Sequence, residues 1–139
     1  MEIVSIILVF ISLFYLVKSY LLSINNKISL KKIHNRKRYC ILIPARDESK
    51  VIEDLLKSIL NQTRKIDPKD VYVIVETKTD PTVKIVKKYK MNIVYRKDLT
   101  KKRKGYALND AVLEILKKKI KYDAYFIFDA DNVLSKNFI

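Results

Sequence analysis

The sequence predicts an α/β protein with a mainly parallel sheet flanked by helices, preceded by one transmembrane helix. From residue 39 onward, short apolar runs alternate with amphipathic helical segments, which is the pattern of βαβ units. A cluster of charged or polar residues follows each apolar run. Residues 3–24 are almost entirely apolar, and at helical rise a run of that length matches the hydrocarbon thickness of a bilayer.

The apolar run at the N-terminus predicts a membrane anchor over residues 1–24. Its only charged side chain, Lys18, lies near the end of the run, where it can reach the membrane interface together with Tyr15 and Tyr20. A cleaved signal peptide or a buried core helix is the alternative. The segment before the run carries no basic side chain, and no small-x-small cleavage pattern follows it, which favours the anchor.

Residues 25–38 predict a basic juxtamembrane linker. It contains six basic side chains and no acidic one: Lys27, Lys31, Lys32, Arg36, Lys37 and Arg38. The positive-inside rule then predicts a single-pass protein of the cell membrane, with the N-terminus outside and the C-terminal domain in the cytoplasm. Because the linker adjoins a membrane span, we expect it to contact anionic lipid headgroups and not nucleic acid.

Composition excludes several kinds of chemistry. The net charge of +14 over 139 residues favours anionic partners, although a lysine-rich solvated surface would have the same balance. The single cysteine, Cys40, rules out an intrachain disulfide, and its apolar neighbours predict that it is buried. The single histidine, His34, lies in the basic linker, so the chain offers neither a His-based catalytic triad nor a His/Cys zinc site. One glycine, Gly105, excludes glycine-rich phosphate loops, so a metal and basic side chains would have to hold any bound phosphates.

The apolar pattern places four strands and three helices. We expect the strands at residues 39–44, 71–75, 92–95 and 124–128. The helices are expected over 51–60 with Ser49 as a candidate N-cap, after Asp80-Pro81, and after Gly105. In a parallel sheet the carboxyl ends of the strands share one edge, and ligands bind beyond that edge.

The last strand leads directly into Asp129-Ala130-Asp131. Two carboxylates beyond an apolar strand need a cation or a donor to offset their desolvation. One can bind Mg²⁺ or Mn²⁺ while the other accepts a hydrogen bond from a ribose hydroxyl, and the metal can neutralise a diphosphate leaving group. A D-x-D pattern alone is a weak signal, but its position after a buried strand strengthens it.

Four motifs in order resemble the N-terminal half of family 2 glycosyltransferases: ILIPARDE (41–48), IVETKTDPT (74–82), KGYALNDAV (104–112) and FDADN (128–132). These are inverting, nucleotide-sugar-dependent enzymes with the A-type glycosyltransferase fold. The resemblance covers residues 39–139 and implies an incomplete nucleotide-sugar-binding α/β domain.

The resemblance also implies a donor site and a metal site. Donor-binding residues would be Pro44, Ala45, Glu48, Glu76, Asp80, Lys104, Asn109 and Asp129, and the metal ligands for Mg²⁺ or Mn²⁺ would be Asp131 and Asp129. Glu76 stands where the family usually has an aspartate that binds uracil, so we expect a UDP-sugar. For Asn109, a helix cap or a solvated position is an equally good interpretation.

These features predict the N-terminal fragment of a membrane-anchored glycosyltransferase. Its product would be a cell-surface glycan or glycolipid, with the acceptor itself unidentified. The general base and the Q-x-x-R-W motif of the family are not in this chain, which has no tryptophan, so we expect the fragment to be inactive. Two alternatives stay open: a non-catalytic membrane-tethered module that binds nucleotides or anions, and a nucleotidyltransferase of similar fold.

Overall fold

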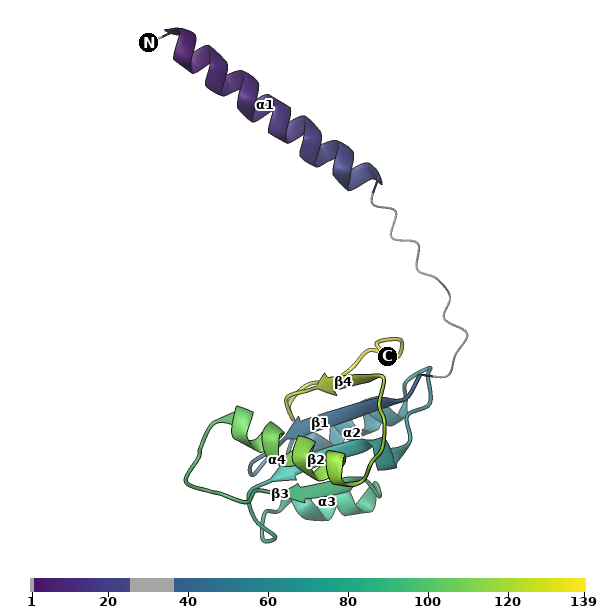
Figure 1. Ribbon diagram of the computed structural model, residues 1–139. Helices are drawn as coiled ribbons and strands as arrows, with labels where there is room; N and C mark the ends of the chain where they lie inside the picture. The colour runs from purple at the N-terminus through teal and green to yellow at the C-terminus, as the bar shows by residue number, and fades with distance from the viewer. Residues whose placement is uncertain (1, 26–36) are drawn as a thin grey trace. The chain divides into compact units, whose positions relative to one another are not determined.

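The computed structural model describes residues 2–25 and 37–139 (Figure 1). The chain divides into two compact units, Met1–Asn35 and Arg36–Ile139. Four of the basic residues predicted in the linker, Lys27, Lys31, Lys32 and Arg36, lie outside the described residues. The other two, Lys37 and Arg38, donate hydrogen bonds to Asp123 and Asp70 of the second unit.

The first unit contains helix α1 (Glu2–Asn25). The segment Ile3–Ser23 is long and apolar enough to cross a membrane, and none of its side chains is buried against the protein. The predicted N-terminal apolar helix is therefore confirmed as a helix.

The second unit contains one parallel sheet, as predicted. Its strands are β1 (Tyr39–Pro44), β2 (Val71–Val75), β3 (Asn92–Tyr95) and β4 (Ala124–Ile127), in the spatial order β3-β2-β1-β4. β1 pairs with β2 on one side and with β4 on the other, so the order reverses at β1.

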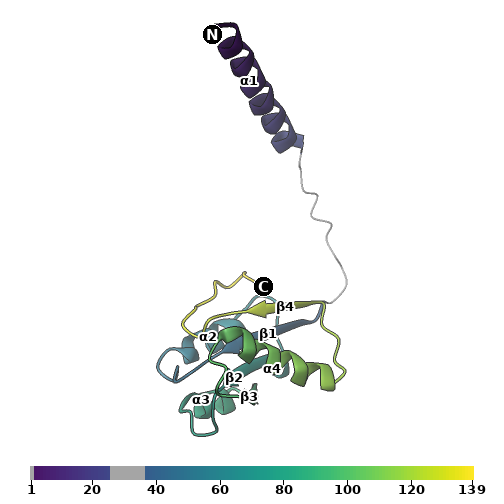
Figure 2. The same cartoon turned by 60° about the vertical axis from the view of Figure 1, so that its left-hand side comes forward.

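Helices cover both faces of this sheet (Figures 1 and 2). Helices α2 (Ile52–Leu60) and α3 (Thr82–Lys88) pack on one face, and α4 (Lys104–Lys117) packs on the other. A short 3₁₀ turn, η1 (Pro68–Asp70), leads into β2. The predicted N-cap at Ser49 is wrong, because the N-cap position of α2 is Val51, two residues later, and its side chain makes no capping hydrogen bond.

The alternation of side chains along β1 divides the core into two parts. Ile41 and Ile43 point toward α2 and α3, whereas Cys40 and Leu42 point toward α4. Cys40 is fully buried, as predicted, and burial raises the pKa of its thiol to about 12. Since both faces are covered, the central strands can be continuously apolar.

The outer strand β4 is less protected than β1. Its side chains Tyr125 and Ile127 are 45% and 56% exposed. They lie on the α4 side of the sheet, because they pair with Cys40 and Leu42. The sheet thus has an edge strand with apolar side chains in solvent.

Candidate functional site

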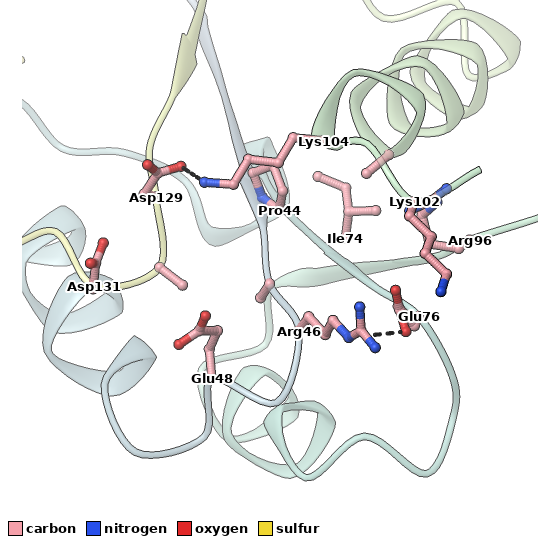
Figure 3. Close-up of a pocket in the computed structure, with 13 residues that line it drawn as sticks. Pro44, Arg46, Glu48, Ile74, Glu76, Arg96, Lys102, Lys104, Asp129 and Asp131 are labelled. Atoms are coloured by element: carbon pink, nitrogen blue, oxygen red, sulfur yellow. Dashed lines mark hydrogen bonds and ion pairs between the residues drawn. The ribbon is translucent and has the colours of Figure 1, made fainter. Parts of the chain in front are cut away.

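A pocket of about 300 Å³ opens at the carboxyl ends of β1 and β4 (Figure 3). It is lined by Pro44, Ala45, Arg46, Glu48, Ile74, Glu76, Arg96, Lys102, Lys104, Ala107, Asp129, Ala130 and Asp131. The strand order reverses at β1, and open parallel sheets bind ligands at such a reversal. Seven of the nine predicted site residues meet here: Pro44, Ala45, Glu48, Glu76, Lys104, Asp129 and Asp131.

The loop after β1 is held by hydrogen bonds to β2, to the loop after β2 and to the start of α3. The Ala45 N–H donates to the Ile74 carbonyl at 2.8 Å, which continues the strand pairing by one residue. Asp47 then adopts a left-handed conformation with φ 55°, and its N–H donates to Asp80 Oδ2 at 3.1 Å. The next N–H, that of Glu48, donates to Thr82 Oγ1 at 3.1 Å. These bonds position Glu48 at the pocket.

Asp80 does not line the pocket, although the resemblance places it among the donor-binding residues. It is buried, and its other carboxylate oxygen accepts from the Thr82 N–H at 2.8 Å. The N-cap position of α3 is Pro81, one residue later than the Asp80-Pro81 pattern predicts. Asp80 nevertheless binds the first N–H of α3, and it braces the β1 loop at the same time. Asn109 also lies outside the pocket, as an exposed residue of α4.

The acidic side of the pocket comes from the end of β4 and from Glu48 (Figure 3). The Phe128 N–H donates to the Leu42 carbonyl at 3.1 Å, so the chain is held against β1 until the two aspartates begin. The Asp129 N–H then donates to Asn132 Oδ1 at 3.1 Å, which closes a turn around Asp131. Asp129 and Asp131 both reach the pocket from this turn.

The basic side of the pocket comes from β1, β3 and the start of α4. Lys104 crosses the pocket to Asp129, with 2.8 Å between Nζ and Oδ1, and this hydrogen bond raises the pKa of Lys104 (Figure 3). Arg46 Nε lies 3.4 Å from Glu76 Oε2, so the partner of Arg46 is Glu76.

Arg96 supports the loop between β3 and α4. Its side chain is only 6% exposed, and its Nε lies 3.4 Å from Oδ2 of Asp110. The Arg96 guanidinium also donates to the carbonyls of Asp98 and Lys101. Asp110 accepts a second contact from the Lys97 N–H at 3.2 Å. This loop therefore has an internal frame and leads to Lys102 and Lys104.

Two carboxylates of the pocket could serve as ligands of a divalent ion whose coordination a bound phosphate would complete. Within residues 2–25 and 37–139, no group of three or more His, Cys, Asp or Glu side chains is arranged to hold a metal. Asp129 and Asp131 supply two hard oxygen ligands in one pocket with Lys102 and Lys104. Mg²⁺ commonly binds through one or two carboxylates, and water and substrate phosphates complete its coordination.

Three basic residues of the pocket were not among the predicted site residues: Arg46, Arg96 and Lys102. In the sequence, Arg46 beside Asp47 is typical of a surface ion pair. The basic run 96–104 is equally typical of a solvated loop and of a segment that contacts phosphate. Each of the three belongs to a segment that follows a strand, and that position is the signal that could have identified them.

Comparison with known families agrees with this geometry. The model of Glycosyl transferase family 2 matches residues 40–139, and the chain belongs to this family. No curated protein sequence matches the chain significantly.

Solved structures with the same fold include S. aureus TarS, with a TM-score of 0.55 and 20% identity over 72% of this chain and 18% of that one. M. tuberculosis glucosyl-3-phosphoglycerate synthase has a TM-score of 0.52 and 20% identity over 70% and 35%. The latter enzyme is also known in complex with Mn²⁺, UDP and phosphoglyceric acid, with a TM-score of 0.51 and 20% identity over 70% and 34%. These similarities show the fold, and the chain spans only about a fifth to a third of the length of these proteins.

Proposed function

We propose that the pocket binds the nucleoside diphosphate of a UDP-sugar together with Mg²⁺ or Mn²⁺, as the donor site of a membrane-anchored glycosyltransferase. The observation that carries the proposal is the meeting of Asp129 and Asp131 with Lys102 and Lys104 in one pocket at the strand-order reversal. A diphosphate bridged by a metal needs both kinds of charge, carboxylates for the ion and ammonium groups for the phosphate oxygens.

The nucleoside would lie against the β1 and β2 loops. Pro44 and Ala45 provide an apolar contact, and Glu76 can accept a hydrogen bond from the uracil N–H. Arg46 holds Glu76 in place at 3.4 Å, which supports a base contact despite the longer side chain at this position. Glu48 and Asp129 can accept from the ribose hydroxyls.

The phosphates would lie between the two aspartates and the basic loop. When bound, the metal stabilises the negative charge that develops on the leaving UDP. Lys104 is able to move from Asp129 to a phosphate oxygen, because its side chain is 69% exposed.

The proposed reaction is an inverting transfer. An acceptor hydroxyl attacks the anomeric carbon, the bond from that carbon to the UDP oxygen breaks, and a base takes the hydroxyl proton. The acceptor is proposed to be a cell-surface glycan or a glycolipid. We assign no residue of this chain as the base.

We also propose that α1 anchors the protein in the cell membrane, with the N-terminus outside. Its length, its apolar composition and the exposure of its side chains support this. The basic residues that follow it support the orientation.

Calorimetry with UDP, with and without Mn²⁺, tests the donor site. The intact chain should bind UDP more tightly with Mn²⁺, and Asp131→Asn should remove most of that gain without changing affinity in metal-free buffer. Asp54→Asn, an exposed acid of α2 outside the pocket, is the matched control. Absence of UDP binding would overturn the proposal, and an unchanged metal effect in Asp131→Asn would overturn the metal assignment. Preference for UTP with a sugar phosphate would favour a nucleotidyltransferase instead.

A further inference from the structure

The positive charge of the second unit is concentrated at one edge. Four segments that lead into the strands, 37–38, 61–70, 87–91 and 117–123, form what we call the basic edge. They contain 12 Lys and Arg against 3 Asp, a net charge of +9, whereas the rest of residues 37–139 contains 12 against 11, a net charge of +1. The segments gather at one edge because all four strands are parallel and begin there (Figure 1).

Most of this charge is available to a partner. Ten of the 12 basic residues are exposed. Within the described part of the chain, eight lysines of the basic edge form no ion pair with an acidic side chain: Lys65, Lys69, Lys87, Lys90, Lys117, Lys118, Lys119 and Lys121. The helix dipole stabilises basic side chains at helix C-termini. That effect explains only the basic residues in the last turns of α3 and α4.

The chain enters the second unit at this same edge and is fixed there. Arg38 makes a two-pronged contact with the buried Asp70, with 2.7 Å from Nη2 and 3.1 Å from Nε to Oδ1. Tyr122 donates to the same carboxylate at 3.0 Å. Asp123 accepts from the Arg38 N–H at 2.8 Å and from Lys37 Nζ at 3.2 Å. Lys37 and Arg38 are therefore held at the same edge of the sheet as the unpaired lysines.

We propose that the basic edge binds the anionic phospholipid headgroups of the membrane that α1 crosses. The inference rests on the anchor proposed above, which keeps this edge close to a bilayer through a short connection. Lysines near an anionic lipid surface are attracted within about one Debye length, roughly 8 Å at physiological salt. Nucleic acid could also bind such charge, but the tether favours lipid. The donor pocket lies at the opposite ends of the strands and would open toward water, from which a nucleotide sugar arrives.

Energy transfer from the protein to the lipid surface tests this inference. The intact chain is inserted into vesicles of neutral phosphatidylcholine, or into vesicles in which about a third of the lipid is anionic phosphatidylglycerol. Each kind of vesicle contains a lipid whose headgroup carries the acceptor dye. The donor dye is attached at Asn61→Cys on the basic edge or at Thr79→Cys near the pocket, since both positions are exposed and Cys40 is buried. We expect about twofold stronger transfer from position 61 than from 79 in anionic vesicles only, and loss of this difference at 1 M salt.

Two matched variants separate the basic edge from charge in general. Neutralising Lys69, Lys117, Lys119 and Lys121 to Gln should abolish the difference in anionic vesicles. The control variant replaces four exposed lysines outside the basic edge and the pocket with Gln: Lys50, Lys78, Lys84 and Lys97. It removes the same charge and should keep the difference in transfer between positions 61 and 79. Circular dichroism melting checks that both variants are folded.

The outcomes distinguish this inference from the anchor itself. If the chain does not float with either kind of vesicle at high salt, the anchor is wrong and the inference fails with it. If the chain floats but transfer does not depend on lipid charge, or if the two quadruple variants behave alike, the inference alone is overturned. Release of the edge from anionic vesicles by equimolar RNA would favour nucleic acid and would also overturn it.

Discussion

At the scale of single residues, Asp80 shows how a carboxylate can serve a site without entering it. Its two oxygens accept from the N–H groups of Asp47 and Thr82, at 3.1 and 2.8 Å. The first bond fixes the loop that carries Glu48, and the second satisfies the first N–H of α3. A buried carboxylate with two N–H donors is stabilised by these donors in place of water.

Asp80→Ala should lower the free energy of unfolding by about 2 kcal/mol, because it leaves two backbone donors without a partner. Chemical denaturation measures this loss. The exposed Asp54→Ala should change stability by no more than about 0.5 kcal/mol. Equal stabilities of the two variants would show that the Asp80 contacts contribute little.

Arg96 and Asp110 are a second case in which residues act through others. Both are largely buried, and together they hold the loop that precedes Lys102 and Lys104. Asp110→Asn keeps the size of the side chain but removes the charge that balances Arg96. We expect about tenfold weaker binding of UDP, equivalent to about 1.4 kcal/mol, and binding of uridine changed by less than twofold.

Calorimetry with both ligands measures this contrast, which a general loss of folding would not produce. The Asp54→Asn variant again serves as the control. Equal loss for UDP and uridine would show that the pair does not act through the phosphate side of the pocket.

At the scale of elements, α2 and α3 are joined by side chains as well as by their shared core. Glu53 on α2 accepts from Lys88 Nζ at 2.8 Å and from the Tyr89 hydroxyl at 2.7 Å. These hydrogen bonds, that of Lys88 first, lower the pKa of Glu53 to about 2 from its ordinary value of 4.5. The two helices cover the face of the sheet that contains Ile41 and Ile43.

This link should be sensitive to acid. A carboxyl with a lowered pKa in the folded state stabilises the fold above its ordinary pKa, and that contribution is lost as the pH falls from about 5 toward 2. NMR titration should find Glu53 protonated only near pH 2 and should find its pKa closer to 4.5 in Lys88→Met. Glu53→Gln should lack this part of the acid dependence of stability. A Glu53 pKa near 4.5 in the unaltered chain would contradict the contact.

At the scale of the whole molecule, the two proposed binding surfaces lie at opposite ends of one sheet. The carboxyl ends of the strands form a pocket of mixed charge, and the amino ends carry nearly all of the net positive charge of residues 37–139. A parallel sheet makes this possible, because every strand begins at one edge and finishes at the other.

The 139-residue chain by itself is expected to bind a UDP-sugar without transferring the sugar. It spans between 18% and 35% of the length of the solved structures reported above, and no base is assigned in it. Incubation with UDP-glucose and Mn²⁺, followed by chromatography of released UDP, measures turnover above the rate of a sample without protein. Turnover that Asp131→Asn abolishes would contradict the expectation.

Local patterns in the sequence were sufficient to predict the strands, the helices and the edge of the sheet at which the pocket lies. Continuous apolar runs predicted strands covered on both faces, and the polar residues after each run predicted the edge at which the pocket opens. Pattern and family resemblance together predict Glu48, Glu76, Lys104, Asp129 and Asp131, because each lies in the segment after a strand or begins a helix beside the sheet.

Only the tertiary structure decided which of these residues meet. Asp80 lies in the same loop as Glu76, yet it turns inward to bind backbone N–H groups, which no local pattern distinguishes from a ligand contact. The partner of Arg46 is a residue of another loop, and Arg96 is paired with a helix residue fourteen positions later. Such contacts depend on how separate strands are placed side by side, and the concentration of charge at the basic edge depends on it as well. Composition determined that this protein is strongly basic, whereas the parallel order of its strands determined where that charge lies.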